Sequence, residues 1–282
     1  MVKVLETILL PFVLASHYRG GTYKVRQQEN DMIKIVNTQT WRRGKLQYFF
    51  VRFSTFLGFD MYENNCQPDD VIQQNPSDVP MPGQCWAGSC QSADLSYTVL
   101  FVADNYCYGD GENFIPRPEN PYIFGWRSRA WVPFTDDLGQ EYGDNWSMIH
   151  QFMWMYDPAN NTPDFKLPPL WLIMAGCPNQ EIDLAPHDFD GDTVRCRWAV
   201  GDEAGGAELD PVRHPSLSLD GDNCIVKYDG TLDASQVGVK PIALMMEDFD
   251  SEGNIRSSVP VQFLAQVWTP TMNRNGFIVR KI

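Results

Sequence analysis

The chain has 282 residues, of which 43% are hydrophobic and 21% are charged, so it can bury a core and is not expected to be disordered. Its 22 basic and 36 acidic residues leave a net charge of −14, which disfavours nucleic acid and anionic membranes as partners because both would repel it. No apolar run reaches the roughly 18 residues of a membrane-spanning helix, so no membrane insertion is expected.

The first residues resemble a secretory signal peptide. The segment 8–15 (ILLPFVLA) is apolar, and Val13 and Ala15 place small residues before a plausible cleavage site. We therefore expect a signal peptide at 1–15, a mature chain that begins at Ser16, and a secreted, extracellular protein. A buried N-terminal strand or helix is the alternative.

Cysteine usage points to the same compartment. The chain has seven cysteines without a CxxC or Cys/His zinc spacing, and its four histidines are too scattered for a metal site. In an oxidising compartment six cysteines would pair, and the odd one could link two chains into an oligomer. Buried cysteines of a cytosolic protein are the alternative. Asn145 and Asn160 begin Asn-x-Ser/Thr tripeptides and are the expected glycosylation sites.

The first part of the chain, 16–165, is predicted to be an N-terminal β domain with long loops, because its apolar residues recur with a period of two. The predicted strands are a hairpin of 22–26 and 32–36, then 46–57, 95–103, 128–134 and 146–156. The last of these could instead be a short helix. Loops are predicted at 64–88, 109–120 and 136–144, and the first is long enough to suggest disulfides or a binding surface.

A proline-rich stretch at 157–169 is typical of a linker, so a domain boundary is expected there. The segments after it are typical of an immunoglobulin-like β-sandwich at 170–270, followed by a tail at 271–282. Its predicted strands are 170–174, 181–184, 193–200, 224–228, 239–246 and 258–268. The predicted fold class is therefore all-β, with two β-sandwich-like domains stapled by disulfides.

Two cysteines lie within predicted strands of the second domain. A bridge between Cys196 and Cys224 would join its two sheets over Trp198. A pairing of Cys196 with Cys177 is the alternative.

Four motifs occur in order along the second domain: 188–199 (DFDGDTVRCRWA), 224–230 (CIVKYDG), 247–249 (EDF) and 257–264 (SSVPVQFL). The series resembles a recurrent module of animal extracellular and cell-surface proteins, and 17–22 (HYRGGT) and 40–43 (TWRR) resemble the opening of the same proteins. The resemblance implies an extracellular β module. Where members carry a cysteine pair, this chain has 202–207 (DEAGGA). More distantly, the domain resembles immunoglobulin-like and cadherin-like sandwiches, whose loops often use Asp-x-Asp to bind calcium.

Acidic residues in two predicted loops suggest a metal site. The first loop has three aspartates around Gly191, whose carboxylates can converge on one hard cation, although the spacing excludes an EF-hand. The second group (Glu247, Asp248, Asp250 and Glu252) follows the strand 239–246. If both loops leave the same end of the sandwich, they could share calcium. The expected ligands are Asp188, Asp190, Asp192, Asp248 and Asp250, and the alternative is two solvated turns.

No GxSxG, HExxH, P-loop or GxGxxG motif is present in the sequence. The sequence therefore predicts a secreted, non-enzymatic adhesion, matrix or recognition protein that binds another extracellular protein or a glycan. One alternative is a secreted hydrolase with a carboxylate pair in the first domain, such as Asp136 and Asp137. Another is a carrier whose aromatic-rich first domain encloses an apolar ligand.

Overall fold

The computed structural model describes residues 18–28, 31–42, 71–74, 95–102, 106–116, 122–129, 134–142, 145–152, 160–168, 170–205, 214–232, 237–272 and 278–280. The predicted signal peptide at 1–15 and the predicted strand at 46–57 lie outside these residues. Cys66, Cys85 and Cys90 lie outside them as well.

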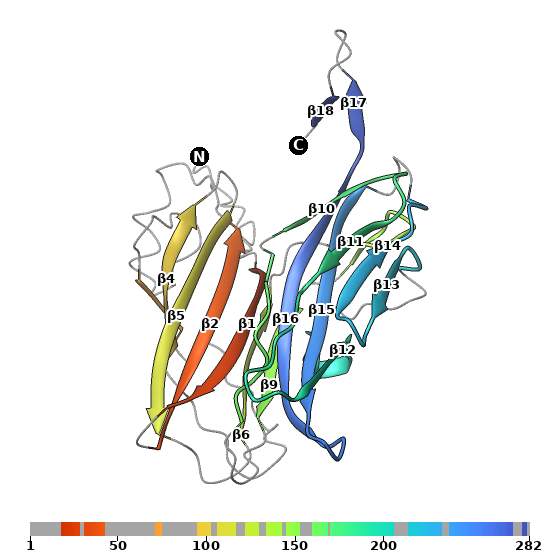
Figure 1. Cartoon of the computed structure of the whole chain (residues 1–282). Coiled ribbons are helices and arrows are strands. Elements are labelled where there is room, and N and C mark those ends of the chain that lie inside the picture. The colour runs from red at the N-terminus through yellow and green to blue at the C-terminus, as the bar shows by residue number, and fades with distance from the viewer. Residues whose placement is uncertain are drawn as a thin grey trace, which may run out of the picture.

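The described residues form an all-β protein, which confirms the predicted fold class (Figure 1). The strands of the first part are β1 (Tyr18–Gln27), β2 (Met32–Arg42), β3 (Val71–Gln74), β4 (Leu95–Val102), β5 (Tyr106–Pro116), β6 (Tyr122–Arg129), β7 (Phe134–Thr135), β8 (Glu141–Tyr142) and β9 (Asn145–Phe152). The later strands are β10 (Trp171–Met174), β11 (Gln180–Asp183), β12 (Thr193–Trp198), β13 (Leu217–Asp220), β14 (Ile225–Tyr228), β15 (Gly238–Phe249), β16 (Ile255–Trp268), β17 (Pro270–Met272) and β18 (Ile278–Arg280). A 3-10 helix, η2 (Gly201–Glu203), follows β12.

Most predicted strands are present, but four predictions in the first part are wrong at least in part. Residues 109–116, expected in a loop, belong to β5, which pairs with β2 along its whole length and with β4 on its other edge. The glycines and acidic residues of β5 hide its strand pattern, while its two neighbours supply the backbone hydrogen bonds. The expected strand at 128–134 is divided between the end of β6 and the start of β7. The predicted loops at 64–88 and 136–144 contain the short strands β3 and β8. The strand predicted at 146–156 is confirmed as β9, and its helical alternative is excluded.

An 11-stranded sheet runs through the described residues, and most of its strands follow the order β12-β15-β16-β1-β2-β5-β4-β3. In Figure 1 it extends from β4 at the left to β12 at the right. One edge of β16 pairs with β15, and the other edge is shared by three strands. These are β9 at Ser257 and Ser258, β1 at Val261 and Gln262, and β10 from Ala265 to Trp268. The predicted domain limits at 165 and 170 stay a prediction, and this sheet crosses them.

Gly20 lets β1 approach β16 closely. Its φ is +139°, and a Cβ atom at this position would lie 2.1 Å from the carbonyl oxygen of Gln262. A side chain would therefore force the two backbones apart. Gly20, the first glycine of the segment 17–22, thus has a structural role in joining the first hairpin to β16.

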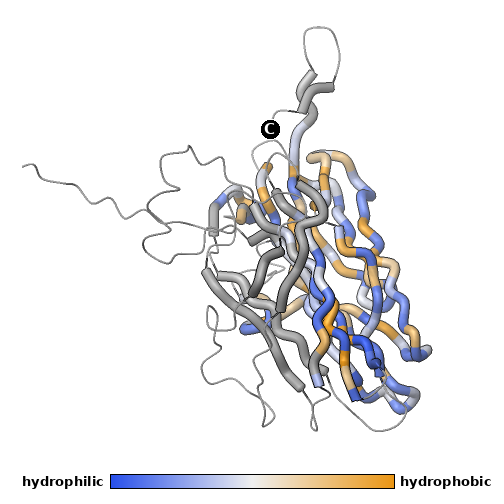
Figure 2. The backbone as a smooth tube through the Cα atoms, turned by 90° about the vertical axis from the view of Figure 1, so that its left-hand side faces the viewer, coloured by the Kyte–Doolittle hydropathy of each residue, from blue (hydrophilic) through white to orange (hydrophobic). Residues whose placement is uncertain are grey.

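The second sheet of the sandwich has the order β11-β14-β13 and covers one face of β15 and β16. The apolar residues between the two sheets form one core. Figure 2 shows how hydrophobic and hydrophilic residues alternate along the strands that contribute to it. Cys196 of β12 is bonded to Cys224, the residue before β14, with 5.2 Å between the Cα atoms. The disulfide joins the two sheets, as predicted, and Trp198 packs against the same core.

The segment 160–166, within the predicted linker, lies between β1 and the residues that follow β11, and is called the seam segment below. Thr162 N donates to Val25 O at 3.1 Å, and Val25 N donates to the Thr162 hydroxyl at 3.0 Å. On its other side, Asp164 and His187 exchange two backbone hydrogen bonds of 2.7 Å. The seam segment is therefore fixed on both sides and connects β1 to the sandwich.

Candidate functional site

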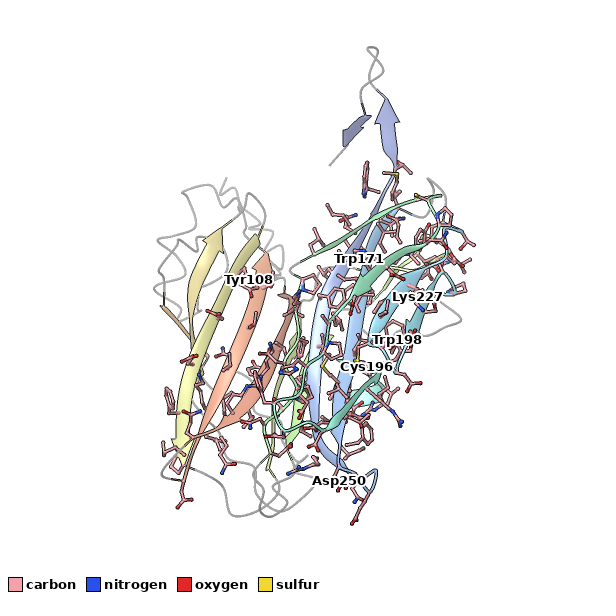
Figure 3. The ribbon with its side chains drawn as sticks, in the orientation of Figure 1. Tyr108, Trp171, Cys196, Trp198, Lys227 and Asp250 are labelled. Atoms are coloured by element: carbon pink, nitrogen blue, oxygen red, sulfur yellow. A yellow bond between two sulfur atoms is a disulfide. The ribbon has the colours of Figure 1, made fainter. Side chains whose placement is uncertain are left out.

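The two acidic loops lie at the same end of the sandwich, as the prediction of a shared site requires. Asp192 of the first loop accepts a hydrogen bond of 3.0 Å from Arg256, which follows the β15–β16 turn. Figure 3 labels Asp250 at the tip of that turn. We call the loop 187–192, the turn 250–254 and the adjoining residue Asp248 the acidic end.

Asp188 organises the first loop. Its Oδ1 atom accepts hydrogen bonds from the backbone N–H groups of Asp190, at 2.8 Å, and Asp192, at 3.0 Å. Gly191 has a φ of +85°, which favours glycine at this point of the turn. These contacts are those of a structural Asx turn, the alternative that the sequence left open.

Asp250 plays the same part in the β15–β16 turn. Its Oδ1 accepts from the backbone N–H groups of Glu252, at 2.9 Å, and Asn254, at 2.8 Å, and its Oδ2 accepts from the Asn254 amide at 3.0 Å. Hydrogen bonds from Asn254 and Glu252 lower the pKa of Asp250. The carboxylate of Asp250 is thus engaged within its own turn.

Asp248 is buried at the end of β15, with no solvent exposure. Its Oδ1 accepts from the Ser257 hydroxyl at 2.6 Å, and its Oδ2 accepts from the Asn160 amide at 2.9 Å. Burial raises the pKa of Asp248 to about 6, and the negative charge of Asp188 acts in the same direction, against the two hydrogen bonds. Asp188 and Asp248 are therefore close enough for their charges to interact.

Asn160 connects the seam segment to Asp248. The residue is 1% exposed, and its Nδ2 atom, to which a glycan would be attached, donates to Asp248. Next to it, the Asn161 amide donates to Asp190 Oδ1 at 3.0 Å. Sequence reasoning identified Asn160 only as a glycosylation site, because the contact joins residues 88 positions apart.

The predicted calcium ligands are only partly brought together. Asp188 and Asp248 interact, Asp190 and Asp192 bind Asn161 and Arg256, and Asp250 lies in a separate turn. Within the described residues, no group of three or more His, Cys, Asp or Glu side chains is arranged to hold a metal ion. Calcium binding stays a prediction. Because the aspartates alone do not form a site, a ligand set would have to include a residue other than His, Cys, Asp or Glu.

Phe189 is the exposed aromatic residue of the acidic end, with 58% of its surface accessible. The Arg26 guanidinium lies 4.9 Å from the ring centroid, and His187 contacts the ring edge-to-face, also at 4.9 Å. An exposed phenylalanine is thus held in place by a cation and a second ring.

The carboxylate pair considered for a hydrolase lies at the other end of β15. Asp136 Oδ1 accepts from the backbone of Leu138 and Gln140, at 2.9 and 2.8 Å. Asp137 Oδ1 lies 2.9 Å from Lys240 Nζ, and its Oδ2 accepts from Ser216 N at 3.0 Å. Both carboxylates are buried and engaged in the structure of their turn.

Cys177 is a free, exposed cysteine, so the alternative pairing of Cys196 with Cys177 is excluded. Asn145 begins β9, and its glycosylation stays a prediction. The described residues contain no helix with the length and apolar character needed to cross a bilayer.

The fold defines a disulfide-bridged β-sandwich protein. No family model and no curated protein matches the sequence. Solved cadherin ectodomains show weak similarity: Protocadherin gammaB7 EC3-6 (TM-score 0.31, 13% identity, 95% of this chain and 74% of that chain), the Protocadherin GammaB4 extracellular domain (0.29, 12%, 88% and 42%) and Drosophila N-cadherin EC1-4 (0.26, 12%, 88% and 67%). At these scores the likeness carries no functional argument.

Proposed function

We propose that this chain is an extracellular, non-enzymatic recognition module that binds another extracellular protein or a glycan through its acidic end, with calcium as its cofactor. The observation that carries the proposal is the exposed Phe189 ring, held by Arg26 and His187. An aromatic side chain that is already fixed loses little conformational freedom when it meets a partner, so its contact area contributes to affinity.

The disulfide supports the extracellular part of the proposal. Bonds such as Cys196–Cys224 form and persist in oxidising compartments and are rare in the cytosol. By joining the two sheets, the bond also keeps the loops of the acidic end on a rigid support. A rigid scaffold with exposed loops is a common arrangement for binding other surfaces.

The hydrolase alternative receives no support from Asp136 and Asp137. A glycosidase needs one carboxylate free to donate a proton and another free to attack or to activate water. Here the two side chains hold a turn and a buried lysine. The carrier alternative depends on the aromatic-rich segments of the first part of the chain. Most side chains of those segments are not among the ones that the structure describes.

Binding of the full-length, secreted and fluorescently labelled protein to cell surfaces and extracellular matrix tests the proposal. We expect saturable binding that Phe189→Ser weakens by about tenfold or more, as for a central aromatic contact. Treating the surface with a protease or with glycosidases then distinguishes a protein partner from a glycan.

Leu138→Ser is the matched control, because Leu138 is also an exposed apolar residue, at 77%, and lies in the β7–β8 turn at the opposite end of β15. Binding should survive this substitution. If Phe189→Ser binds as well as the unmodified protein, or Leu138→Ser is equally impaired, the acidic end is not the recognition surface.

A further inference from the structure

Two buried oxygen atoms have no hydrogen-bond partner among the described residues: Asp188 Oδ2 in the acidic end and Asn160 Oδ1 in the adjoining seam segment. The two residues are only 9% and 1% exposed, so bulk water reaches neither atom freely. Buried polar atoms are rarely left unpaired, so two of them in one cluster call for a bound water molecule or ion as their partner.

Both oxygens belong to one cluster with Asp248. Asn160 is fixed on Asp248 through its nitrogen, which leaves its oxygen available. Asp188 is fixed through its other oxygen to the loop backbone, and its charge acts on Asp248. The cluster thus offers two carboxylates and one amide oxygen, drawn from three separate segments of the chain.

The charges around the cluster do not balance. Four carboxylates lie around the cluster against two guanidinium groups. Arg256 pairs with Asp192, and Arg26 interacts with Asp188 and Asp190 in addition to its ion pair with Asp164. Lys24 and Asp164 beside them neutralise each other. These groups leave an excess of two negative charges, without counting Asp250 and Glu252 of the neighbouring turn, so the cluster favours a cation. The four carboxylates are those of Asp188, Asp190, Asp192 and Asp248.

We propose that Asp188 Oδ2, Asn160 Oδ1 and the carboxylate of Asp248 bind one Ca²⁺ ion that fastens the seam segment to the sandwich. Calcium takes six to eight oxygen ligands in flexible geometry, including carboxylates and amide carbonyls, and accepts water in the remaining positions. Magnesium fits less well, because it demands octahedral geometry and gives up its water reluctantly. Asp248 is included because each of its oxygens accepts one hydrogen bond and keeps a second lone pair, beside the two unpaired oxygens. Asp190, Asp192 and Asp250 are left out of the ligand set because none of them has a buried oxygen without a hydrogen-bond partner.

This inference rests on the proposed function, because it names the residues that would bind the calcium cofactor proposed there. The calcium site and the recognition role are tested by separate experiments. A calorimetric titration of the full-length, chelator-treated protein with Ca²⁺ measures the cation site alone. We expect a dissociation constant of about 10⁻⁴ to 10⁻³ M, as for extracellular calcium modules, and weaker binding of Mg²⁺ at equal ionic strength. Surface binding of the Phe189→Ser variant measures the recognition role, so either can fail without the other.

Four variants sharpen the titration. Asp188→Asn keeps the oxygen that holds the loop but loses a charge, and Asn160→Ala loses an amide ligand. Each should weaken Ca²⁺ binding by about tenfold or more, because affinity follows the number and charge of the ligands. Asn160→Asp keeps a ligand oxygen and should still bind. Asp250→Asn removes an acid from the same end but from outside the site, and should bind as the unmodified protein does.

Circular dichroism of each variant confirms that it is folded before titration. The proposal is overturned if the unmodified protein binds no Ca²⁺, which would leave water as the partner of the two oxygens. It is also overturned if Asn160→Ala binds normally. Equal weakening by Asp250→Asn and Asp188→Asn would show that calcium is attracted by the general negative charge alone.

Discussion

Lys240 Nζ lies 2.9 Å from Asp137 Oδ1, and neither side chain is exposed to solvent by more than a few per cent. Lys240 stands on the core-facing side of β15, at the opposite end from Asp248, and Asp137 reaches it from the β7–β8 turn. His214 Nδ1 lies 3.4 Å from the same carboxylate oxygen. A buried positive charge is thus neutralised by a residue from the first part of the chain.

Breaking this ion pair should strongly destabilise the fold. Asp137→Ala leaves Lys240 charged and buried, which costs about 3 to 5 kcal/mol of unfolding free energy when one partner of a buried pair is removed. Burial alone would raise the pKa of Asp137, but hydrogen bonds from His214, Lys240 and Ser216 outweigh it and lower the pKa. This contribution is therefore present above about pH 4, the ordinary range of a carboxyl, and is lost as the pH falls below it.

Urea unfolding of Asp137→Ala, Lys240→Met and the double variant measures this contribution. The double variant should be more stable than Asp137→Ala, because methionine no longer buries a charge. Glu112→Ala is the control, since it breaks the more exposed Lys34–Glu112 pair of 2.9 Å and should cost less than about 1 kcal/mol. Similar losses for Asp137→Ala and Glu112→Ala would contradict a special role of the buried pair.

Removal of the Cys196–Cys224 disulfide is expected to lower stability without changing the fold. The bond joins residues separated by 28 positions, and closing a loop of that size contributes about 3 to 4 kcal/mol in the chain-entropy model. The double replacement Cys196→Ser with Cys224→Ser should show this loss in urea unfolding. Cys177→Ser is the control and should leave the stability within about 0.5 kcal/mol, as for surface substitutions.

Gly20→Ala should weaken the pairing of β1 with β16, because the added methyl would meet Gln262 O at 2.1 Å. Gly253→Ala is the control for backbone strain, because Gly253 also has a positive φ, of +85°. A methyl group added there would meet no atom within 4 Å, so this variant has the strain without the clash. We expect Gly253→Ala to lose about 1 kcal/mol and Gly20→Ala clearly more. Thermal unfolding compares the two, and equal losses would show that strain alone accounts for the effect.

Ionisation of Asp248 should make calcium-free protein less stable as the pH rises. Its folded pKa of about 6 lies above the unfolded value of about 3.9, so the folded state binds the proton more tightly. The stability from this group is present below about pH 4, is lost between about pH 4 and 6, and amounts to about 3 kcal/mol. Asp248→Asn cannot ionise and should gain stability relative to the unmodified protein across this window. A difference that does not vary with pH, measured by urea unfolding with a chelator present, would contradict this.

Glycan mapping tests the two predicted acceptors. A glycan on Asn160 would have to replace its hydrogen bond to Asp248 and emerge from a buried position. We therefore expect Asn160 to be unmodified in folded, secreted protein. Mass spectrometry of peptides before and after enzymatic deglycosylation shows which acceptor is occupied, and a fully occupied Asn160 would exclude it as a calcium ligand.

Local sequence patterns were sufficient to predict those strands that bury every second residue. Cys196 and Cys224 lie beside such alternation, so their bridge between sheets followed from the sequence. β5 was missed because its neighbours, rather than its own side-chain pattern, make it a strand. Asn160 and Lys240 were missed as members of polar clusters because their partners are distant in the chain, and no local pattern marks such a contact.

The shared edge of β16 also sets the order in which the protein can be assembled. During synthesis β1, β9 and β10 all leave the ribosome before β16. The edge of each strand that pairs with β16 in the folded protein therefore has no native partner until residues 255–268 emerge. Contacts of such long sequence separation make folding slow, and waiting strand edges are prone to pair with other chains. The nascent chain should therefore depend on chaperones until β16 closes the sheet.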